Sequence, residues 1–379
     1  MDRKSILKQF HEDLTPKNIS QEHVGFINSL DLDPAESRYL LCGAADSSVS
    51  IWDTWVFGSS RSLNQKIQPI LHTQRHDAHK YGVSKASWWP MDTGMFVTAS
   101  FDSTVKLWDT NSGESVYSFD MEHRVYNIDI NPLNTNGLVA VGMDHPYCRL
   151  LDLRIATSAH TLKGHSGRII STKWNPMNEY ILASAGSDGT VRIWDIRQAA
   201  SCVSSMDMMR TDQDLDLTPI DYRRAHRSSV NGLCWFPTGT RLISLGNDNK
   251  SRVWSLSVPG GINESINYGP LVQNRHLQTL DPVLSHLGDL ETPYLFVPSD
   301  TGDILVFQAL DGRLVRKLES PEGYKASRYA CIVKGEPKTA VYYSGNGNGA
   351  ITEWTALEQD TSDDEDNELV SATVGDYLN

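Results

Sequence analysis

Short alternating runs of apolar and polar residues divide the chain into strand-sized pieces, most clearly between residues 164 and 197. Three runs there, at 169–174, 180–185 and 190–194, follow the period of two that is typical of a half-buried β-strand. The connections between them are rich in Asn, Pro, Asp and Gly, which favour tight turns. The stretch therefore predicts three antiparallel strands, introduced by a Gly-His pair and closed by a Trp-Asp pair.

The same unit recurs along the chain. Six further stretches share this arrangement, at 23–53, 79–109, about 123–154, 226–254, about 276–309 and about 324–356. Two of them are weaker, because Leu151 and Phe307 stand where the closing Trp is expected. A repeat of ~40–45 residues with these ends is the signature of the WD40 repeat, which builds one four-stranded propeller blade. We therefore expect an all-β fold, a seven-bladed WD40 β-propeller.

The sequence predicts three regions. Residues 1–20 predict a short amphipathic helix with Ile6, Leu7, Phe10 and Leu14 on one side, either a frayed terminus or a helix that docks on a partner. The propeller then spans 21–356, and we expect a strand near residues 19–24 to complete the last blade and remove an exposed edge. Residues 357–379 carry eight acidic residues and no Lys or Arg, which predicts a disordered acidic tail.

Composition argues against several classes of protein. The net charge is −13, and the tail contributes most of it, so we expect no direct contact with nucleic acid. No apolar run of ~18 residues is present, so we expect no membrane span. Five scattered cysteines without a C-x-x-C pair indicate neither a disulfide framework nor a zinc site, and we expect no metal and no cofactor. A long spacing between repeats predicts a flexible acidic loop at about 198–222.

A His, a hydroxyl residue, an Asp and a Trp recur at fixed spacing in three repeats. These quartets are His79, Thr98, Asp102 and Trp108; His165, Ser184, Asp188 and Trp194; and His226, Ser244, Asp248 and Trp254. The residue types match a Ser-His-Asp triad, but an active site is not needed three times in one ring. We interpret the quartets as chains of hydrogen bonds that satisfy the buried indole N–H. Cys42 stands at the hydroxyl position of the first repeat, so we expect that blade to lack the hydroxyl and to be looser.

Each end of the predicted propeller has its own candidate binding residues. Arg154 and Arg197 follow the third strands of neighbouring blades in the pattern Asp-x-Arg, which places both at one face. They either bind a partner, since Arg is frequent in interface hot spots, or pair with the acidic residues of their own blades. At the opposite face we expect partner contacts from loop residues just before the turn Asp or two to three after the blade His. These residues are Tyr81, Phe101, Arg168, Ser187 and Asn247.

Several stretches go beyond the general repeat. The Pro-x-Asp-Thr-Gly-Met-Phe block at 90–96 is not part of the repeat consensus, and the stretches 180–197, 230–234 and 267–269 accompany it. Over about 23–356 the chain resembles the Cockayne syndrome group A family, WD40 substrate receptors of cullin-4 ubiquitin ligases.

The resemblance implies a non-catalytic subunit of an E3 ubiquitin ligase, acting in the nucleus in transcription-coupled nucleotide excision repair. The implied partners are the triple-propeller damaged-DNA-binding adaptor of a cullin-4-type ligase, a Cockayne syndrome group B-type ATPase and RNA polymerase II, with one copy of this chain in the complex. The family docks on the adaptor through a W-D-x-R motif, here Trp194, Asp195 and Arg197, with Arg154 as a weaker second candidate. The family also uses an N-terminal helix-loop-helix, for which residues 1–20 are short.

Two alternatives remain open on the sequence alone. One is a WD40 scaffold that binds a peptide or a histone tail without any ligase. The other is an enzyme with a propeller fold, which the lack of a catalytic constellation disfavours.

Overall fold

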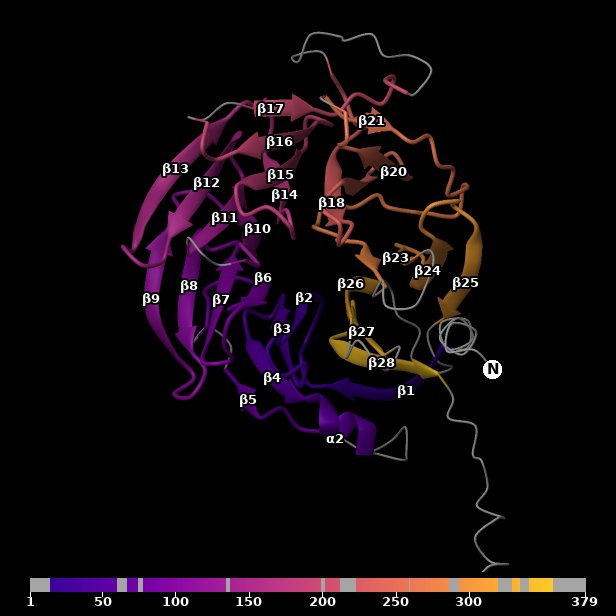
Figure 1. Ribbon diagram of the computed structural model, residues 1–379. Coiled ribbons are helices and arrows are strands. Elements are labelled where there is room, and N and C mark those ends of the chain that lie inside the picture. Colours follow the sequence, from indigo (N-terminus) through magenta and orange to yellow (C-terminus); the bar gives the residue numbers. More distant parts are fainter. Residues whose placement is uncertain are drawn as a thin grey trace, which may run out of the picture.

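The alternating segments form strands, and the strands lie in seven four-stranded antiparallel sheets arranged as blades around a centre (Figure 1). The structure is a computed structural model. It describes residues 14–59, 67–73, 78–133, 137–198, 202–211, 223–258, 260–285, 293–319, 329–334 and 341–356. The first strands of successive blades lie next to one another around the middle of the ring (Figure 1). The predicted all-β, seven-bladed propeller is therefore confirmed.

Blades one to four follow the chain in order. Blade one contains β2 (Ile27–Leu32), β3 (Tyr39–Ala44), β4 (Val49–Asp53) and β5 (Leu71–His72), with helix α2 (Thr54–Ser59) after β4. Blade two contains β6 (Val83–Trp88), β7 (Met95–Ser100), β8 (Thr104–Asp109) and β9 (Glu114–Asp120). Blade three contains β10 (Val125–Ile130), β11 (Leu138–Met143), β12 (Tyr147–Asp152) and β13 (Thr157–Lys163). Blade four contains β14 (Ile169–Trp174), β15 (Ile181–Gly186), β16 (Val191–Asp195) and β17 (Cys202–Ser205).

The remaining blades complete the ring. Blade five contains β18 (Val230–Trp235), β19 (Arg241–Gly246), β20 (Lys250–Ser255) and β21 (Ile262–Asn263). Blade six contains β22 (Val283–Leu284), β23 (Tyr294–Pro298), β24 (Asp303–Gln308) and β25 (Leu314–Glu319). Blade seven contains β26 (Tyr329–Lys334), β27 (Tyr342–Asn346), β28 (Ala350–Ala356) and, from the other end of the sequence, β1 (Leu14–Gln21).

The ring closes through the pairing of β1 with β28. Leu14 lies opposite Ala356 and Gln21 lies opposite Ala350, with a register shift between Pro16 and Asn18. Pro16 is tolerated because β1 is the outermost strand of its sheet, where one backbone edge needs no donor. The expectation of a helix over 1–20 was therefore wrong for residues 14–20, and the propeller begins at 14 instead of 21. The side chain of Leu14 is buried beside Trp354 and Tyr342, so it packs into a sheet and not onto a helical stripe. Residues 1–13 and the tail 357–379 lie outside the described residues.

The core consists of apolar clusters between neighbouring blades. Trp52, for example, packs with Ile351 of blade seven, and Trp194 packs with Leu150 of blade three. Phe307 and Leu151 occupy the Trp position in blades six and three and are equally buried. A smaller apolar side chain at that position is thus compatible with a complete blade.

The expectation of a flexible loop at 198–222 was wrong for its described part. Cys202–Ser205 form the outer strand β17, and the side chain of Met206 is fully buried in the cluster that contains Trp254. The apolar side chain and the strand pairing hold this segment against blades four and five. Residues 199–201 and 212–222 lie outside the described residues.

Candidate partner-binding surfaces

The antiparallel blades give the propeller two faces with different loops. We call lower face the end that holds the turns after the first and third strands of each blade. We call upper face the end that holds the loops before the first strands and the turns after the second strands. Arg154 and Arg197 follow β12 and β16, both third strands, so they lie on the lower face. The turns that carry Asp102, Asp188 and Asp248 follow second strands and lie on the upper face.

The quartets of blades two, four and five have the same geometry. In blade four, the Trp194 Nε1–H donates to Ser184 Oγ at 2.8 Å, and Ser184 Oγ lies 2.7 Å from His165 Nε2. His165 Nδ1 lies 3.1 Å from Asp188 Oδ2. The corresponding distances in blade two are 2.8, 2.7 and 3.0 Å, along Trp108, Thr98, His79 and Asp102. In blade five they are 2.8, 2.7 and 2.8 Å, along Trp254, Ser244, His226 and Asp248.

This geometry is that of a structural element and not of a nucleophile. Ser184 is fully buried, and its hydroxyl accepts from the indole while it donates to the imidazole, so no substrate reaches it. Although burial opposes ionisation of Asp188, the hydrogen bond from His165 holds the pKa of that carboxyl well below its usual range. The carboxylate also accepts from the backbone N–H groups of Ser166 and Thr190. Each quartet therefore ties the loop before the first strand to the turn after the second.

Blade one also has a hydroxyl group between its Trp and its His, but a different strand supplies it. The Trp52 Nε1–H donates to Ser50 Oγ at 2.8 Å, and Ser50 Oγ lies 2.7 Å from His23 Nε2. Ser50 is the cross-strand partner of Cys42, the residue at the expected hydroxyl position. Ser48 connects His23 Nδ1, at 2.9 Å, to the carboxylate of Asp46. The expectation that this blade lacks the hydroxyl was wrong, because the neighbouring strand supplies it.

On the lower face, Arg197 is both fixed and exposed. Its Nε and Nη2 groups donate to the two oxygens of Asp195 at 3.0 and 2.7 Å. The guanidinium also lies over the ring of Tyr180, 4.7 Å from its centre. The hydrogen bonds from Arg197 lower the pKa of Asp195, so that carboxyl stays ionised. Yet the Arg197 side chain is 59% exposed, and two of its five N–H donors are used, which leaves three for a partner.

Two other arginines on the lower face repeat this fork. Arg154 donates through Nε and Nη2 to Asp152 at 3.2 and 2.9 Å and is 63% exposed. Arg38, which the sequence analysis missed, donates to Asp53 at 3.1 and 2.6 Å and lies 4.3 Å from the ring centre of the exposed Trp55. Arg38 precedes the second strand of its blade and does not follow the third. The Asp-x-Arg pattern therefore overlooks it, although Asp53 occupies the same position as Asp195.

The other members of the predicted adaptor motif lie beneath the surface. The side chain of Trp194 is fully buried, and Asp195 is 5% exposed. Trp194 belongs to the quartet of blade four, and Asp195 holds the guanidinium in place. Only Arg197 of the three presents a large area to solvent, and it pairs with the acidic residue of its own blade, which is one of the two sequence interpretations. Binding of a partner by Arg197 stays a prediction.

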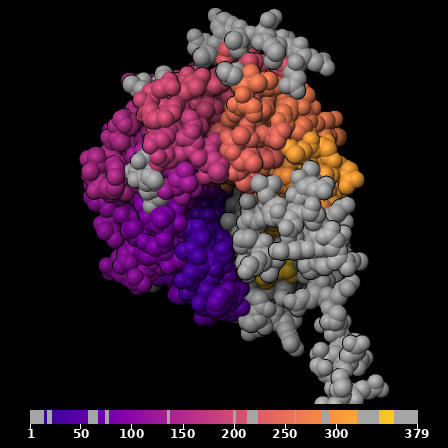
Figure 2. Space-filling view, in the orientation of Figure 1, coloured from indigo at the N-terminus to yellow at the C-terminus, as the bar shows by residue number. Residues whose placement is uncertain are grey.

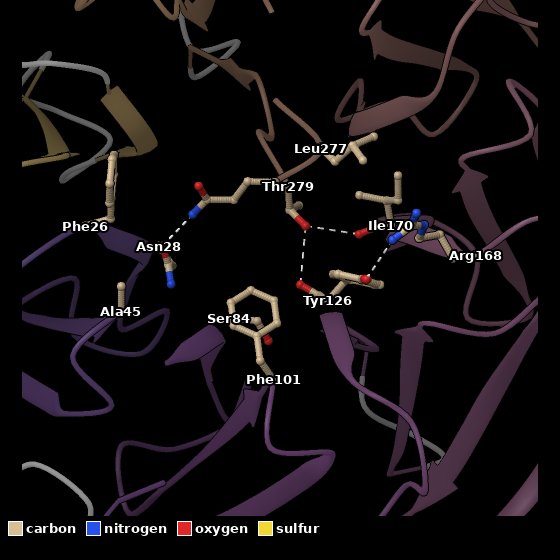
Figure 3. A pocket seen from close by; sticks show the side chains of 11 residues that line it. Phe26, Asn28, Ala45, Ser84, Phe101, Tyr126, Arg168, Ile170, Leu277 and Thr279 are labelled. Atoms are coloured by element: carbon tan, nitrogen blue, oxygen red, sulfur yellow. Dashed lines mark hydrogen bonds between the residues drawn. The ribbon is translucent and has the colours of Figure 1, made fainter. Parts of the chain in front are cut away.

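All five predicted partner-face residues lie on the upper face, but only two of them meet in one site. Phe101 and Arg168 line a cavity of about 300 Å³ at the middle of the ring, together with Tyr126 (Figure 3). The Phe101 ring stands edge-on to Tyr126 at 6.0 Å between centres, and Arg168 Nη1 donates to the Tyr126 hydroxyl at 3.2 Å. Tyr81, Ser187 and Asn247 do not line this cavity.

Several residues that line this cavity were not predicted from the sequence, including Phe26, Tyr126, Leu277 and Thr279. Phe26 and Tyr126 stand three residues after His23 and His123, the same offset that relates Arg168 to His165. The rule that found Arg168 thus finds both aromatic residues when it is applied to blades one and three. Thr279 stands three residues after His276, where the sixth repeat was expected to begin, so the same rule reaches it as well. No signal in the sequence marked Leu277.

The segment 276–281 crosses the middle of the ring, where the space-filling view shows a hollow (Figure 2). The Thr279 hydroxyl donates to the carbonyl of Ile170 at 3.0 Å, and Gln278 donates to Asn28 of blade one (Figure 3). Asp281 lies 3.3 Å from Lys85 and 3.4 Å from Lys173, which belong to blades two and four. Burial opposes ionisation of Asp281, but Lys173 and Lys85 still hold its pKa below the usual range. Further hydrogen bonds to the carbonyl of Tyr126 and from Asn231 add blades three and five, so the segment contacts blades one to five. Its residues 277–279 line the upper-face cavity.

The described residues contain neither a metal-binding cluster nor a membrane-spanning helix. There, no group of three or more His, Cys, Asp or Glu side chains has the arrangement of a metal site. None of the helices in the described residues is long and apolar enough to cross a membrane.

The chain is similar to known repeat proteins. The model of the WD domain, G-beta repeat, matches residues 15–53, 70–109, 156–195 and 218–255. WD repeat-containing protein ATCSA-1 of Arabidopsis thaliana is 34% identical over 283 residues, which cover 72% of this chain and 62% of that protein. Radiation-sensitive protein 28 of Saccharomyces cerevisiae is 28% identical over 264 residues, which cover 64% and 52%. Histone acetyltransferase type B subunit 2 of Candida glabrata is 25% identical over 229 residues, covering 59% and 51%.

The chain thus spans between half and two thirds of the length of these relatives. The four matched repeats contain the first three strands of blades one, two, four and five, and they agree with the observed sheets. In the described residues, each of these four blades has a hydrogen-bonded His, hydroxyl and Trp. The chain is a WD40-repeat protein.

Proposed function

We propose that this chain is a substrate receptor of a cullin-4-type E3 ubiquitin ligase that acts in the nucleus in transcription-coupled nucleotide excision repair. The lower face docks on the triple-propeller adaptor, and the upper face binds repair partners, among them a Cockayne syndrome group B-type ATPase and RNA polymerase II. The protein does no chemistry of its own in this proposal. Its similarity to ATCSA-1 and to a protein named for radiation sensitivity supports this direction.

The observation that carries the proposal is the exposed, forked guanidinium of Arg197. A side chain held by two hydrogen bonds and an aromatic ring loses little further freedom when a partner binds. Arginine is also frequent among the residues that dominate binding energy at interfaces. Arg38 with Trp55, and Arg154, extend the same chemistry over blades one and three.

Affinity purification of the full chain from cells tests the proposal. Arg197→Ala should abolish co-purification of the adaptor and the cullin, and Arg154→Ala should weaken it less. Arg313→Ala is the matched control, because Arg313 is exposed on the same face but has no forked carboxylate in the described structure. Undiminished adaptor recovery with Arg197→Ala would refute the docking role and favour a scaffold that works without a ligase.

A further inference from the structure

The upper face carries a ring of exposed cations. In five consecutive blades, two to six, the loop before the first strand contains an exposed Lys or Arg. These residues are Lys80, Arg124, Arg168, Arg227 and Arg275. Because the chain as a whole carries a net charge of −13, the general composition does not explain a cationic face.

The fold itself places these cations. The backbone N–H of Lys80 donates to Asp102 at 2.9 Å, that of Arg227 to Asp248 at 3.2 Å, and that of Arg275 to Asp300 at 2.6 Å. The three residues therefore occupy equivalent positions in blades two, five and six. Each repeat that forms this loop-to-turn bond presents the same position to solvent at the rim of the upper face.

The nearby carboxylates leave the ring mostly unneutralised. The side chains of Asp102 and Asp248 are 7% and 11% exposed, and each is bonded to the histidine of its quartet. Arg168 has one distant acidic neighbour, Asp144, at 3.9 Å. Lys80, Arg124, Arg227 and Arg275 form no ion pair with any residue that the structure describes. Asp120, Glu122 and Asp144 expose carboxylates on the same face at blade three, and of the five cations only Arg168 lies within ion-pair distance of an acid in the described residues.

The cavity inside this ring is lined largely by apolar side chains. Phe26 is 39% exposed and Leu277 is 44% exposed, and with Phe101 and Tyr126 they surround an opening with a polar floor (Figure 3). Its volume of about 300 Å³ lies at the small end of ligand sites and suits one large apolar side chain better than an extended ligand. Partly exposed aromatic residues beside arginine are the composition of an interface hot spot.

We propose that the upper face binds an acidic peptide segment of a partner protein, with one large apolar side chain of that segment inserted between Phe26, Phe101 and Leu277. Aspartate and glutamate on either side of the anchor pair with the cations of neighbouring blades. The inference rests on the proposed function, since it gives the chemistry of the partner at the receptor's substrate face. A basic histone tail is disfavoured by charge. A nucleic acid backbone pairs with the cations but leaves the apolar cavity unfilled.

Fluorescence anisotropy with the purified full chain tests this. The probe is a short labelled peptide with phenylalanine between two blocks of aspartate and glutamate. It should bind, and more weakly as salt rises. The combined variant Lys80→Glu, Arg227→Glu and Arg275→Glu should weaken binding about tenfold or more, because three exposed ion pairs become repulsive. The three single variants, each with a smaller loss, keep the test available if the triple variant does not fold.

Two controls separate charge from the anchor. Leu277→Ser should remove the preference for the phenylalanine peptide over one with serine in its place, while the salt dependence remains. Arg313→Glu, on the lower face, should bind the peptide like the unmodified chain. Equal binding of an Asn/Gln version of the peptide, unchanged binding by the triple variant, or tighter binding of a thymidine oligonucleotide than of the peptide would overturn the inference. The peptide assay contains no adaptor. Absence of peptide binding would therefore leave adaptor docking through Arg197 untouched, and failure of Arg197→Ala to reduce adaptor recovery would leave peptide binding untouched.

Discussion

Blades one and four satisfy the same buried tryptophan with a hydroxyl from different strands. In blade four the hydroxyl is Ser184, ten residues before Trp194 on the second strand. In blade one it is Ser50, two residues before Trp52 on the third strand. The cross-strand pairs explain the exchange, because Ser184 faces Arg192 and Cys42 faces Ser50 at the same step of the ladder.

The comparison shows that the position of the hydroxyl in space matters more than its position in the repeat. An indole N–H buried without an acceptor costs ~1–3 kcal/mol, so a blade that loses one hydroxyl needs another within reach. Neighbouring positions on paired strands are close enough to supply it. The following predictions test whether the two arrangements are equivalent.

The largest effect is expected for Asp188→Ala in blade four. The carboxylate accepts hydrogen bonds from His165 and Thr190 and from the exposed backbone N–H of Ser166, and its removal leaves the buried donors of His165 and Thr190 without this acceptor. We expect a loss of about 3 kcal/mol in the free energy of unfolding, measured by denaturant titration. Asp92→Ala is the control, since Asp92 is an exposed turn residue outside any quartet. A midpoint unchanged from that of the control would show that the quartet does not stabilise the blade.

Ser50→Ala should cost somewhat less, about 2 kcal/mol, because it leaves the Trp52 indole and the His23 imidazole without their hydroxyl. The double variant Ser50→Ala with Cys42→Ser should recover most of this loss, since it rebuilds the blade-four arrangement. Denaturant titrations of the single and double variants measure the coupling. If the second substitution adds to the loss instead, the two positions are not interchangeable.

The histidines predict a dependence on pH. Burial lowers the pKa of His79 and His226 below the ordinary value near 6.5. Their contribution to stability is therefore complete above that value and declines as the pH falls through it, because the unfolded chain binds the protons first. His23 acts in the opposite direction, because, although its burial opposes ionisation, Cys42 and Asp46 raise its pKa to about 10. The test is therefore a difference: the unmodified chain should lose roughly 2–4 °C more in melting temperature between pH 7.5 and 5.5 than the double variant His79→Gln, His226→Gln, at constant ionic strength. An equal change in both proteins would contradict the assignment of neutral, donating histidines.

The smallest effect is expected for Cys42→Ser alone. The new hydroxyl would lie beside Ser50, which already serves Trp52, so it adds no required bond. We expect a change within about 0.5 kcal/mol, measured by the same titration. A loss as large as that of Ser50→Ala would show that the thiol itself has a packing role.

The repeat architecture was predictable because Trp, His and Asp recur at spacings set by strand length. The hydroxyl of blade one was not predicted because Cys42 stands at the expected position, and spacing along one strand gives no information about the strand beside it, which carries Ser50. A closing strand from the N-terminal side was predicted, but near 19–24 instead of at 14–21. Leu14 was assigned to a helix because a single strand with a register shift has no period to recognise, and its partner lies at the other end of the chain. Only some of the residues that line the upper-face cavity could be predicted from the sequence. The loop rule reaches Phe26 and Tyr126, whereas Leu277 comes from a crossing segment that only the tertiary structure reveals.

The pairing of β1 with β28 also determines when the ring can close during synthesis on the ribosome. β1 is translated first and its partner last, so six blades can assemble while the first strand still has nothing to pair with. Until residue 356 emerges, the nascent protein exposes an open sheet edge and an uncovered side of blade one, both of which invite association with other chains. The final strand therefore closes the ring, and we expect a protein that lacks β28 to keep this sheet edge open and to associate more readily with other chains.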